Sequence, residues 1–566
     1  MIEEKLLERI KGGENESTEF KRDLFSDEDA LPSIIALANG PVDGWMIFGV
    51  SEEGNVVGVL GAEGLKRRLV DLCQTECDPP LVPGVDEART ELGTLVVLRV
   101  RGNEREKPYH AKAREIYWIR RGVQNEPVSR DEAVRFVEEH HRVTAPILRE
   151  IRLSRFRSLY DVQLQLKPLN IIIGPNASGK SNLLKALRLI RDVVGKSNWG
   201  PYEASANHLF WYGDPGQTRQ FEIEFTAELP NQQGRYAPRY RISVRADKGK
   251  LAIGEEELRL KLGASTEVEP VSFFSRQGGK VAHYVERSQS ETETPDDVEV
   301  QGKLSLRTAA LYQYGRETTF PPLEDLYQFI LGWRFLQVDP VKARESAIQA
   351  APSGEVPALE DDASNLSDFL YALDREEQHN SFEEIQDRLG RTIGFPEEIR
   401  VESRSSLTGG PDRTVLTFHE GAFPKLNIPA ESMSDGTIRL LAHLSLLIGD
   451  RNATLLCLEE PDQGLHPHLM LRLSDAIRSV VAVEPEAGEI TMRRPQIIII
   501  THSPDFMDCF DLAEEADYLQ VFIARRNLQD GRTLFEPVEA DGFADWLSEY
   551  RLGELTRKNI LDQGVY

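Results

Sequence analysis

The chain has 566 residues, of which 40% are hydrophobic and 28% charged, and its formal net charge is −26. This length exceeds what one hydrophobic core supports, so we expect two or more globular domains. No apolar run approaches the roughly 20 residues of a membrane span, the acidic N-terminus is unlike a signal peptide, and four cysteines do not make a disulfide framework. We therefore expect a cytoplasmic protein without a membrane partner, in which any nucleic-acid site is a local basic patch.

Residues 1–142 alternate short apolar runs with turn-forming residues, which predicts a small α+β domain. Its helices are expected at Ser33–Asn39 and Asp131–Arg142, and its strands at Trp45–Val50, Val56–Leu60, Leu95–Val100 and Ile116–Ile119. The first two strands flank a turn sequence, so they are expected to form a hairpin. A linker at 143–146 is expected to join this domain to residues 147–566.

The segment Gly174–Ser181 reads G-P-N-A-S-G-K-S and follows the apolar run Leu169–Ile173. A strand, a glycine-rich loop and a helix (Asn182–Val193) are typical of a P-loop, because the glycines let backbone N–H groups surround phosphate oxygens at a helix N-terminus. Lys180 is expected to contact the β- and γ-phosphates of ATP, and Ser181 to ligate Mg²⁺. The expected nucleotide contacts are Asn176, Ala177, Ser178, Gly179, Lys180, Ser181 and Asn182.

The middle of the chain carries weaker patterns. Strands are expected at Phe221–Phe225, Arg239–Val244 and Val415–His419, and helices at Asn365–Leu373, Phe382–Leu389 and Thr437–Ile448. Residues 246–305 are polar and turn-rich, with a loop expected at Gln289–Asp297. We interpret residues 230–425, approximately, as a mixed α/β lobe inserted after the P-loop.

Two continuous apolar runs, Leu455–Leu458 and Ile497–Ile500, predict parallel strands buried on both faces. Glu459 and Glu460 follow the first strand, at the edge where α/β sheets bind ligands. We expect Glu459 to bind Mg²⁺ and Glu460 to activate the attacking water. His502 follows the second strand and is expected to contact the γ-phosphate or that water.

The tetrapeptide Ser434–Thr437 reads S-D-G-T and opens a predicted helix. Ser434 is a favourable N-cap residue, and capping alone is a sufficient reason for its presence. A helix start can also hold a γ-phosphate from across a dimer interface. For Ser434 and Gly436 both interpretations stay open, a cap within the chain and a nucleotide contact across a homodimer.

In this order the motifs resemble those of ABC-type ATPases of the RecF/SMC/OLD branch, over residues 147–566. They are Walker A at 174–181, the signature at 434–437, Walker B at 455–460 and the switch residue His502. The resemblance implies an α/β multidomain fold, a P-loop ABC-type ATPase head with an inserted lobe, which holds ATP and Mg²⁺ between the subunits of a homodimer. It also implies that Gly464–His466 crosses the dimer.

The same branch places an arginine of its opening strand and loop near the nucleotide. Arg155 and Arg157 both fit that pattern, and we select Arg157. A Q-loop glutamine is also implied, for which Gln217 and Gln220 are both candidates. OLD-type nucleases carry a Toprim domain after the switch, but too few residues follow His502 here to form one.

Four segments of the N-terminal domain resemble the Schlafen-type AlbA-like domain, namely Glu14–Lys21, Ala36–Val50, Lys107–His110 and Tyr117–Val123. In Schlafen ribonucleases, acidic residues of these segments form a metal-supported site, and Glu14 and Glu19 match the first two by spacing. The third position falls on Ser51, with Glu52 adjacent, and this departure counts against cleavage. The basic residues expected to contact phosphates are Lys21, Arg22, Lys66, Arg67, Arg68, Lys107, Arg120 and Arg121.

Together the motifs favour an ATP-driven switch whose dimerisation repositions N-terminal domains on DNA or RNA. By resemblance, bacterial proteins of this build suit defence against phage or foreign nucleic acid. A second hypothesis is an ATP-gated nuclease that uses Glu14, Glu19 and Glu52. A third is a non-catalytic adaptor, in which ATP binding sets assembly with a partner effector protein. Each is compatible with a higher oligomer.

Overall fold

The structure is a computed structural model. It describes residues 6, 9–10, 13–15, 17–23, 27–40, 44–51, 54–59, 61–81, 83–90, 93–100, 108–113, 116–130, 132–133, 146–213, 219–231, 234–247, 250–261, 271–277, 280–283, 304–316, 321–345, 347–348, 356–376, 380–394, 398–404, 412–419, 427–481, 495–538 and 553–554.

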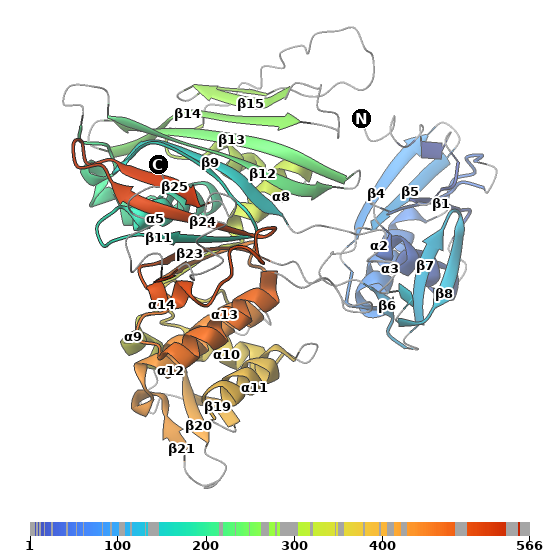
Figure 1. Cartoon of the computed structure of the whole chain (residues 1–566). Helices are drawn as coiled ribbons and strands as arrows, with labels where there is room; N and C mark the ends of the chain where they lie inside the picture. The colour runs from blue at the N-terminus through green and yellow to red at the C-terminus, as the bar shows by residue number, and fades with distance from the viewer. Residues whose placement is uncertain are drawn as a thin grey trace. The chain divides into compact units, whose positions relative to one another are not determined.

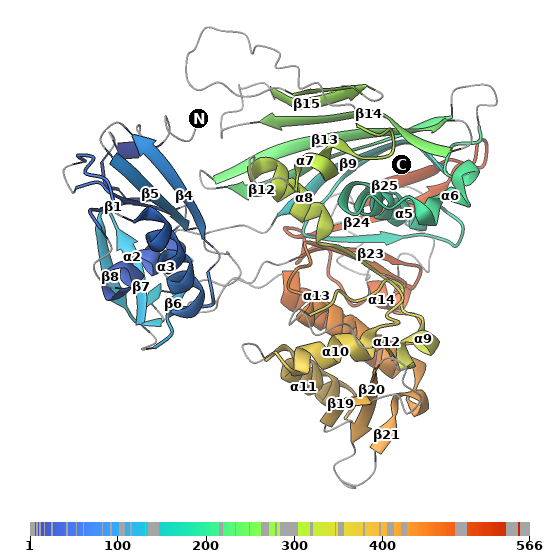
Figure 2. The ribbon, with the colours of Figure 1, turned by 180° about the vertical axis from the view of Figure 1, so that it is seen from behind.

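The chain folds into two compact units that divide between residues 144 and 145, inside the expected linker. Figures 1 and 2 show the elements of each unit from opposite sides. Within the described segments, no helix is both long and apolar enough to pass through a bilayer.

The N-terminal unit contains two four-stranded sheets within its described residues, ordered β1-β2-β5-β4 and β3-β6-β7-β8. Helix α2 contacts β2 of the first sheet and β7 of the second, and its side chains Ile34 and Ile35 are fully buried in the core. The elements are β1 (Thr18–Lys21), α2 (Asp27–Asn39), β2 (Gly44–Phe48), α3 (Ala62–Thr75), β3 (Cys77–Asp78), β4 (Gly84–Thr90), β5 (Gly93–Val100), β6 (His110–Ala111), β7 (Ile116–Arg121) and β8 (Gln124–Val128).

Of the hairpin expected in this unit, the reversal between Val50 and Val56 is confirmed, but the second strand is wrong. Strand β2 pairs with β1 in parallel and with β5 in antiparallel fashion, so both of its edges are occupied. In the described residues, only a single antiparallel bridge joins Val50 to Val56 where the second strand was expected. The helix expected at Asp131–Arg142 lies mostly outside the described residues.

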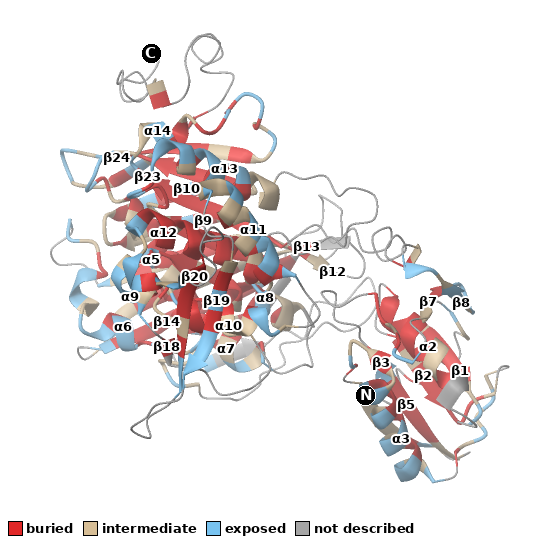
Figure 3. Ribbon diagram, turned by 90° about the horizontal axis from the view of Figure 1, so that it is seen from below, coloured by how far each residue is buried: buried red, intermediate tan, exposed pale blue. Residues whose placement is uncertain are grey.

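The second unit is built on a sheet ordered, over its described strands, β17-β22-β23-β11-β24-β25, in which only β25 is antiparallel to its neighbour. Burial drawn on the ribbon shows the strands of this unit mostly buried and its helices exposed on their outer faces (Figure 3). The strands are β11 (Leu169–Ile173), β17 (Trp333–Leu336), β22 (Leu455–Glu459), β23 (Gln496–Thr501), β24 (Leu519–Arg526) and β25 (Thr533–Val538).

The central sheet separates two hydrophobic cores, because successive side chains of a strand point to opposite faces. Ile172 and Cys457 belong to one core, whereas Ile171 and Leu456 belong to the other. Helices therefore cover both faces, and this explains why β11, β22 and β23 are apolar without alternation. The helices are α5 (Lys180–Ile190), α6 (Gly200–Glu203), α7 (Ala310–Tyr314), α8 (Pro321–Leu331), α12 (Asp435–Leu444), α13 (Pro467–Val481) and α14 (Pro504–Met507).

A seven-stranded antiparallel sheet, counted over the described residues, covers the first core in the order β10-β9-β12-β13-β14-β15-β16. Helices α5 and α8 lie between it and the central sheet (Figure 2). Its strands are β9 (Ile147–Phe156), β10 (Leu159–Gln165), β12 (Gln220–Asn231), β13 (Gly234–Asp247), β14 (Lys250–Lys261), β15 (Val271–Gln277) and β16 (Lys280–His283). The turn-rich interpretation of residues 246–305 is therefore wrong for 250–261, 271–277 and 280–283, and Gln289–Asp297 lies outside the described residues.

The region expected as one inserted lobe, about 230–425, is divided among three places. Strands β13–β16 extend the antiparallel sheet, and α7 and α8 pack beneath it in the first core. Strand β17 forms the edge of the central sheet, and the elements that follow it pack with α12 in the second core. These are α9 (Pro340–Arg344), β18 (Ala347–Ile348), α10 (Leu366–Asp374), α11 (Ser381–Ile393), β19 (Glu398–Arg404), β20 (Arg413–His419) and β21 (Asn427–Pro429).

Candidate nucleotide-binding site

The carboxyl ends of β11, β22 and β23 lie side by side at one edge of the central sheet. Ile173 at the end of β11 is level with Thr501, and Glu459 at the end of β22 is level with Ile500. Because the three strands are parallel, the segments that follow them emerge together. The P-loop, Glu460 and His502 are thus brought to one place, although more than 300 residues separate the first from the last.

Two glycines of the P-loop sit where no side chain fits. Gly179 has φ +100°, and a Cβ there would lie 1.9 Å from Thr533 Oγ1. A Cβ on Gly174 would lie 2.2 Å from the carbonyl oxygen of Ala524. The loop is therefore wrapped tightly against β24 and β25, and α5 begins at Lys180 with its N-terminus at this edge.

Lys180 is buried, and its Nζ donates hydrogen bonds to the carbonyl oxygens of Gly174 (2.6 Å) and Pro175 (2.9 Å). Burial lowers the pKa of Lys180, and the nearby carboxylates of Glu460 and Glu459 act in the opposite direction. The ammonium group therefore lies within electrostatic range of both acids and at the inner side of the loop that would surround phosphate.

Glu460 turns away from the strand that precedes it. Its φ of 50° lies in the left-handed region, which a residue with a side chain seldom adopts, and its backbone N–H donates to the Ile500 carbonyl at 2.8 Å. Its Oε1 lies 3.1 Å from Nδ1 of His502. A carboxylate oriented by an imidazole is suited to accept a proton from water. Non-glycine residues in this strained region often mark functional sites.

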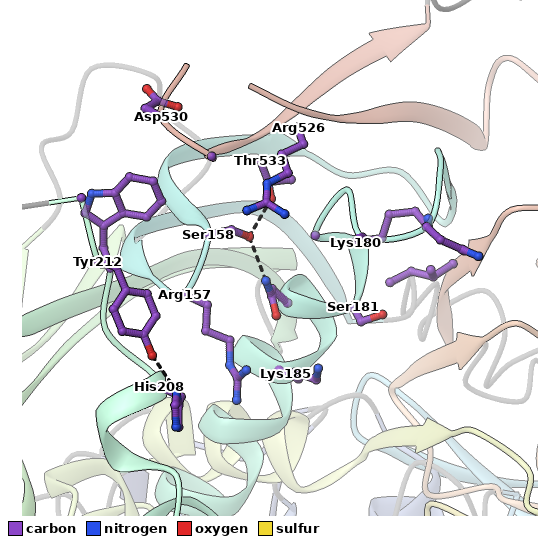
Figure 4. A pocket seen from close by; sticks show the side chains of 18 of the residues that line it. Arg157, Ser158, Lys180, Ser181, Lys185, His208, Tyr212, Arg526, Asp530 and Thr533 are labelled. Carbon is purple, nitrogen blue, oxygen red and sulfur yellow. Dashed lines mark hydrogen bonds between the residues drawn. The ribbon is translucent and has the colours of Figure 1, made fainter. Parts of the chain in front are cut away.

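A cavity of about 740 Å³ extends from the P-loop along the edge of the sheet (Figure 4). Glu460 lines it together with six of the expected P-loop contacts, which are Asn176, Ala177, Gly179, Lys180, Ser181 and Asn182. The seventh, Ser178, is buried, and its carbonyl oxygen accepts a hydrogen bond from Thr533. The residues predicted for phosphate, metal and water therefore converge: Lys180, Ser181 and Glu460 share one cavity.

The turn between β9 and β10 contributes Arg157, whose side chain points into the cavity (Figure 4), whereas Arg155 is absent from the described lining. Both residues have positive φ, 52° for Arg157 and 61° for Arg155. Burial lowers the pKa of Arg157, and within the described part of the chain its Nε is buried without a hydrogen-bond partner. A buried cationic nitrogen without a partner fits an anionic ligand.

Several lining residues were not predicted from the sequence. Ser158 Oγ lies 2.7 Å from Thr533 Oγ1 and accepts a hydrogen bond from Asn182 at 2.8 Å, so the β9–β10 turn, the P-loop helix and β25 are bonded together. Lys185, His208, Tyr212 and Arg526 complete much of the wall. Of these four, only Lys185 could have been predicted from the nearby sequence, because it lies one turn after Ser181 on the same face of a predicted helix.

Of the two glutamines considered for the Q-loop, the one that the structure describes, Gln220, does not lie at this edge. Gln220 begins β12 in the antiparallel sheet, and Gln217 lies outside the described residues. Gln337 follows β17, which pairs in parallel with β22 and so ends beside Glu459. The segment Trp333–Gln337 reads W-R-F-L-Q, and its three apolar residues before a glutamine were the sequence signal for it.

The signature residues lie elsewhere in the chain. Ser434 caps α12, accepting a hydrogen bond from the Thr437 backbone N–H at 3.1 Å, and it is exposed. Among the described lining residues of the cavity, neither Ser434 nor Gly436 occurs. A Cβ on Gly436 would lie 3.0 Å from the Gly464 carbonyl, so the signature helix packs against the expected dimer-crossing loop.

In the N-terminal unit, Glu19 is the centre of a buried polar cluster. Its Oε1 accepts from Ser33 (2.6 Å) and Lys21 (2.8 Å), and its Oε2 from Arg120 (2.6 Å) and Asn125 (3.1 Å). Burial would raise the pKa of Glu19, but Lys21 and the hydrogen bonds of Ser33 and Asn125 outweigh it and hold the pKa below its ordinary value. Both carboxylate oxygens of Glu19 are thus occupied by contacts within the N-terminal unit.

The phosphate contact expected of Arg120 is contradicted. The residue is 3% exposed, and its side chain donates to the carbonyls of Asn15 (2.9 Å) and Thr18 (3.1 Å) as well as to Glu19. Arg121 is exposed beside Glu126 and Glu132.

Of the other two acids of the expected nuclease site, the structure describes Glu14 alone, and Glu14 does not join Glu19 in a metal site. Glu14 accepts the backbone N–H of Phe20 at 2.7 Å, and Glu52 lies outside the described residues. The described residues contain no group of three or more Asp, Glu, His or Cys side chains placed to hold a metal ion.

Comparisons with known families and proteins agree with the sequence resemblances. The family model described as "AAA domain, putative AbiEii toxin, Type IV TA system" matches residues 169–508, and the model described as "Schlafen, AlbA_2" matches residues 14–129. The DNA replication and repair protein RecF of Magnetococcus marinus is 36% identical over 96 residues. That segment covers 16% of this chain and spans 24% of the RecF relative.

Among solved structures, three SMC head domains align with the chain. A head bound to the C-terminal winged-helix domain of ScpA has a TM-score of 0.40 at 16% identity, covering 70% of this chain and 99% of that one. The head from Thermotoga maritima has a TM-score of 0.32 at 13% identity, covering 69% and 99%. A head with an extended coiled coil, bound to a ScpA domain derived from Pyrococcus furiosus, has a TM-score of 0.40 at 14% identity, covering 71% and 99%.

The first family model spans more than half of the 566 residues, and the second covers most of the N-terminal unit. The Schlafen resemblance is thereby confirmed, and so is an ATPase domain after it; the likeness to RecF extends over 96 residues. The chain belongs to the AAA-domain family of the AbiEii type, and it carries a Schlafen AlbA_2 domain before the ATPase domain.

Proposed function

We propose that this protein hydrolyses ATP between two copies of itself and uses the resulting dimerisation to control its Schlafen-type domains on nucleic acid. The observation that carries the proposal is the shared cavity of Lys180, Ser181 and Glu460 at one edge of the central sheet. A strand-end carboxylate and a P-loop lysine on one cavity supply the two requirements of ATP hydrolysis, phosphate binding and water activation.

In the proposed reaction, P-loop N–H groups and Lys180 bind the phosphates of ATP. Glu460, oriented by His502, accepts a proton from water as the water oxygen bonds to the γ-phosphorus. The bond from that phosphorus to the bridging oxygen breaks, which leaves ADP and phosphate. The Ser181 hydroxyl and the Glu459 carboxylate are hard oxygen ligands that fit Mg²⁺, and the ion would neutralise phosphate charge.

We propose Ser434 and Gly436 as the contribution of the second copy. Ser434 is exposed at the N-terminus of α12. Neither Ser434 nor Gly436 is among the described residues that line the cavity of the same chain. A helix N-terminus supplied by the other subunit would bind the γ-phosphate and make closure of the dimer depend on ATP.

The proposed output is nucleic-acid binding by the AlbA_2 domain in the cytoplasm, in defence against phage or foreign nucleic acid. The family description names an AbiEii toxin of a type IV toxin–antitoxin system, which supports a role in such systems. The occupied carboxylate of Glu19 favours binding over cleavage, because an ion-paired acid is a poor ligand for a catalytic metal. DNA, RNA and an effector protein are the candidate partners.

The test is Glu460→Gln, measured by ATP binding and by phosphate release. The variant keeps the shape of the side chain but removes the base, so ATP binding persists while turnover falls roughly 100-fold or more. Glu402→Gln, an exposed glutamate on β19, is the matched control and keeps wild-type turnover. Equal turnover of wild type and Glu460→Gln would remove Glu460 from the reaction.

A further inference from the structure

An aromatic side chain faces the P-loop across the cavity. Tyr212 lines the cavity on the side opposite Lys180, with Arg157 between them (Figure 4). Tyr212 is 65% exposed. Among the described residues, the other large hydrophobic side chains that are exposed are all valine or leucine. Neither the P-loop nor the hydrolytic residues of the proposed reaction explain its position.

The segment that carries Tyr212 is fixed to the wall of the site. A bridge joins Phe210 to Phe156, and the backbone N–H of Trp211 donates to the Arg155 carbonyl at 2.9 Å. The Arg157 N–H donates in return to the Leu209 carbonyl at 2.9 Å. The backbone before Tyr212 is therefore bonded to the same turn that places Arg157 in the cavity.

The contact that orients the ring of Tyr212 is made by its hydroxyl group. Its hydroxyl lies 2.7 Å from Nδ1 of His208, and the two ring centroids are 6.3 Å apart. The neighbouring Trp211 is instead packed on Tyr160 at a centroid distance of 5.4 Å, and the Arg532 guanidinium lies over the ring of Tyr160. Among the described residues, the ring contact of Tyr212 is the tilted one with His208, so Tyr212 presents a ring face to the cavity.

Assuming the proposed ATP site, we infer that Tyr212 is the surface on which the base of the nucleoside triphosphate stacks. The cavity, about 740 Å³, has the size of a small-molecule site, with phosphate-binding groups at one end and this ring at the other. Every base offers a flat π-face, so stacking contributes affinity without selecting one base. The substrate class is therefore a nucleoside triphosphate that is bound by base stacking and by its phosphates.

The experiment compares ATP with inorganic tripolyphosphate, which has the phosphates but no base. In Tyr212→Ala, ATP binding measured by calorimetry weakens roughly 5- to 150-fold, and tripolyphosphate binding is unchanged. Tyr212→Phe keeps the ring and therefore binds ATP like the wild type. The affinity for GTP falls by the same factor as the affinity for ATP in Tyr212→Ala. Because Tyr212 is exposed, the alanine variant folds normally.

The controls separate this inference from the proposed function. Lys180→Ala weakens ATP and tripolyphosphate together, because it removes a phosphate contact. If the wild type binds neither ligand, the proposed function itself is wrong. If the wild type binds both and Tyr212→Ala binds ATP with unchanged affinity, only the role of Tyr212 is overturned. A loss of tripolyphosphate binding in Tyr212→Ala also overturns it, because the ring would then act on the phosphate end.

Discussion

The ion pair of Glu19 and Arg120 is enclosed within the N-terminal unit, with side-chain exposures of 6% and 1%. Arg120 joins β7 to β1 through Glu19 and through two backbone carbonyls, so it connects the two sheets of the unit. Removing one partner of a buried pair leaves the other charge uncompensated, at a cost of about 3–5 kcal/mol. Exposed pairs are worth about 0–1 kcal/mol.

Two adjacent arginines therefore give a matched prediction. Arg120→Ala lowers the local unfolding free energy of the N-terminal unit by about 3–5 kcal/mol, whereas Arg121→Ala changes it by less than about 1 kcal/mol. Native-state hydrogen exchange of peptides from β1 and β7, in the full chain, measures both values. Equal effects of the two substitutions would contradict the buried position of Arg120.

Lys21 and the hydrogen bonds of Ser33 and Asn125, which depress the pKa of Glu19, set a pH dependence with a definite sign. Because the folded pKa of Glu19 is depressed, its stabilisation is complete above the unfolded pKa, about 4.3, and is lost as pH falls through the folded value. Protection of β1 in the wild type therefore decreases below about pH 4. In Glu19→Gln this decrease is absent, because the amide does not titrate.

Single functional residues could be predicted from the sequence where the element that places them is adjacent to them in the chain. Lys180, Ser181 and Glu460 each follow an apolar strand, and parallel strands bring their ends together whatever lies between. Arg120 could not be assigned in this way, because its burial depends on Glu19, 101 positions earlier in the chain. Thr533 was missed for the same reason, since it contacts Ser158 across 375 positions.

At the scale of elements, the pattern of apolar residues decided what could be predicted. The central strands are buried on both faces and read as unbroken apolar runs. Strand β14 carries glutamates and an arginine that pair across strands, as Arg241 does with Glu255 and Glu257, so its polar residues resemble a loop. Strand β1 has only four residues, and its place beside β2 is set by pairing that the sequence does not show.

The P-loop gives a prediction about an element junction. Gly179 at the start of α5 and Gly394 at the end of α11 both have left-handed φ values, +100° and +69°. A Cβ on Gly394 meets nothing within 4 Å, whereas one on Gly179 lies 1.9 Å from Thr533 Oγ1. Gly394→Ala therefore costs only backbone strain, about 1–2 kcal/mol, and Gly179→Ala adds a clash of about 1–3 kcal/mol.

Thermal unfolding and ATP binding read out the difference. Gly394→Ala shows a modest loss of stability and binds ATP normally. Gly179→Ala loses more stability and binds no ATP, because Thr533 and the loop must move apart. Normal ATP binding by Gly179→Ala would mean that the loop is not held against β25 in the way described.

At the scale of the whole molecule, each chain carries both parts of the proposed site, the P-loop cavity and the signature helix, but the described lining of the cavity does not include the signature residues. Lys180 and Glu460 line the cavity, and Ser434 opens α12 outside the described lining. A two-fold axis would present the Ser434 of each copy to the cavity of the other, which makes two equivalent composite sites. The order of motifs along the chain predicts the parts but contains no information on which copy supplies them.

Composite sites predict that two inactive variants restore each other. Lys180→Ala removes the phosphate contact in its own chain, and Ser434→Arg blocks the site of the other chain. In a mixed dimer one site has both defects and the other has neither. With random pairing at equal amounts, half of the dimers are mixed, so phosphate release recovers to about one quarter of the wild-type rate. Ser434→Arg alone must still bind ATP, which shows that its own cavity is intact. No recovery on mixing, at concentrations where the wild type dimerises, would mean that Ser434 acts only as the cap of α12.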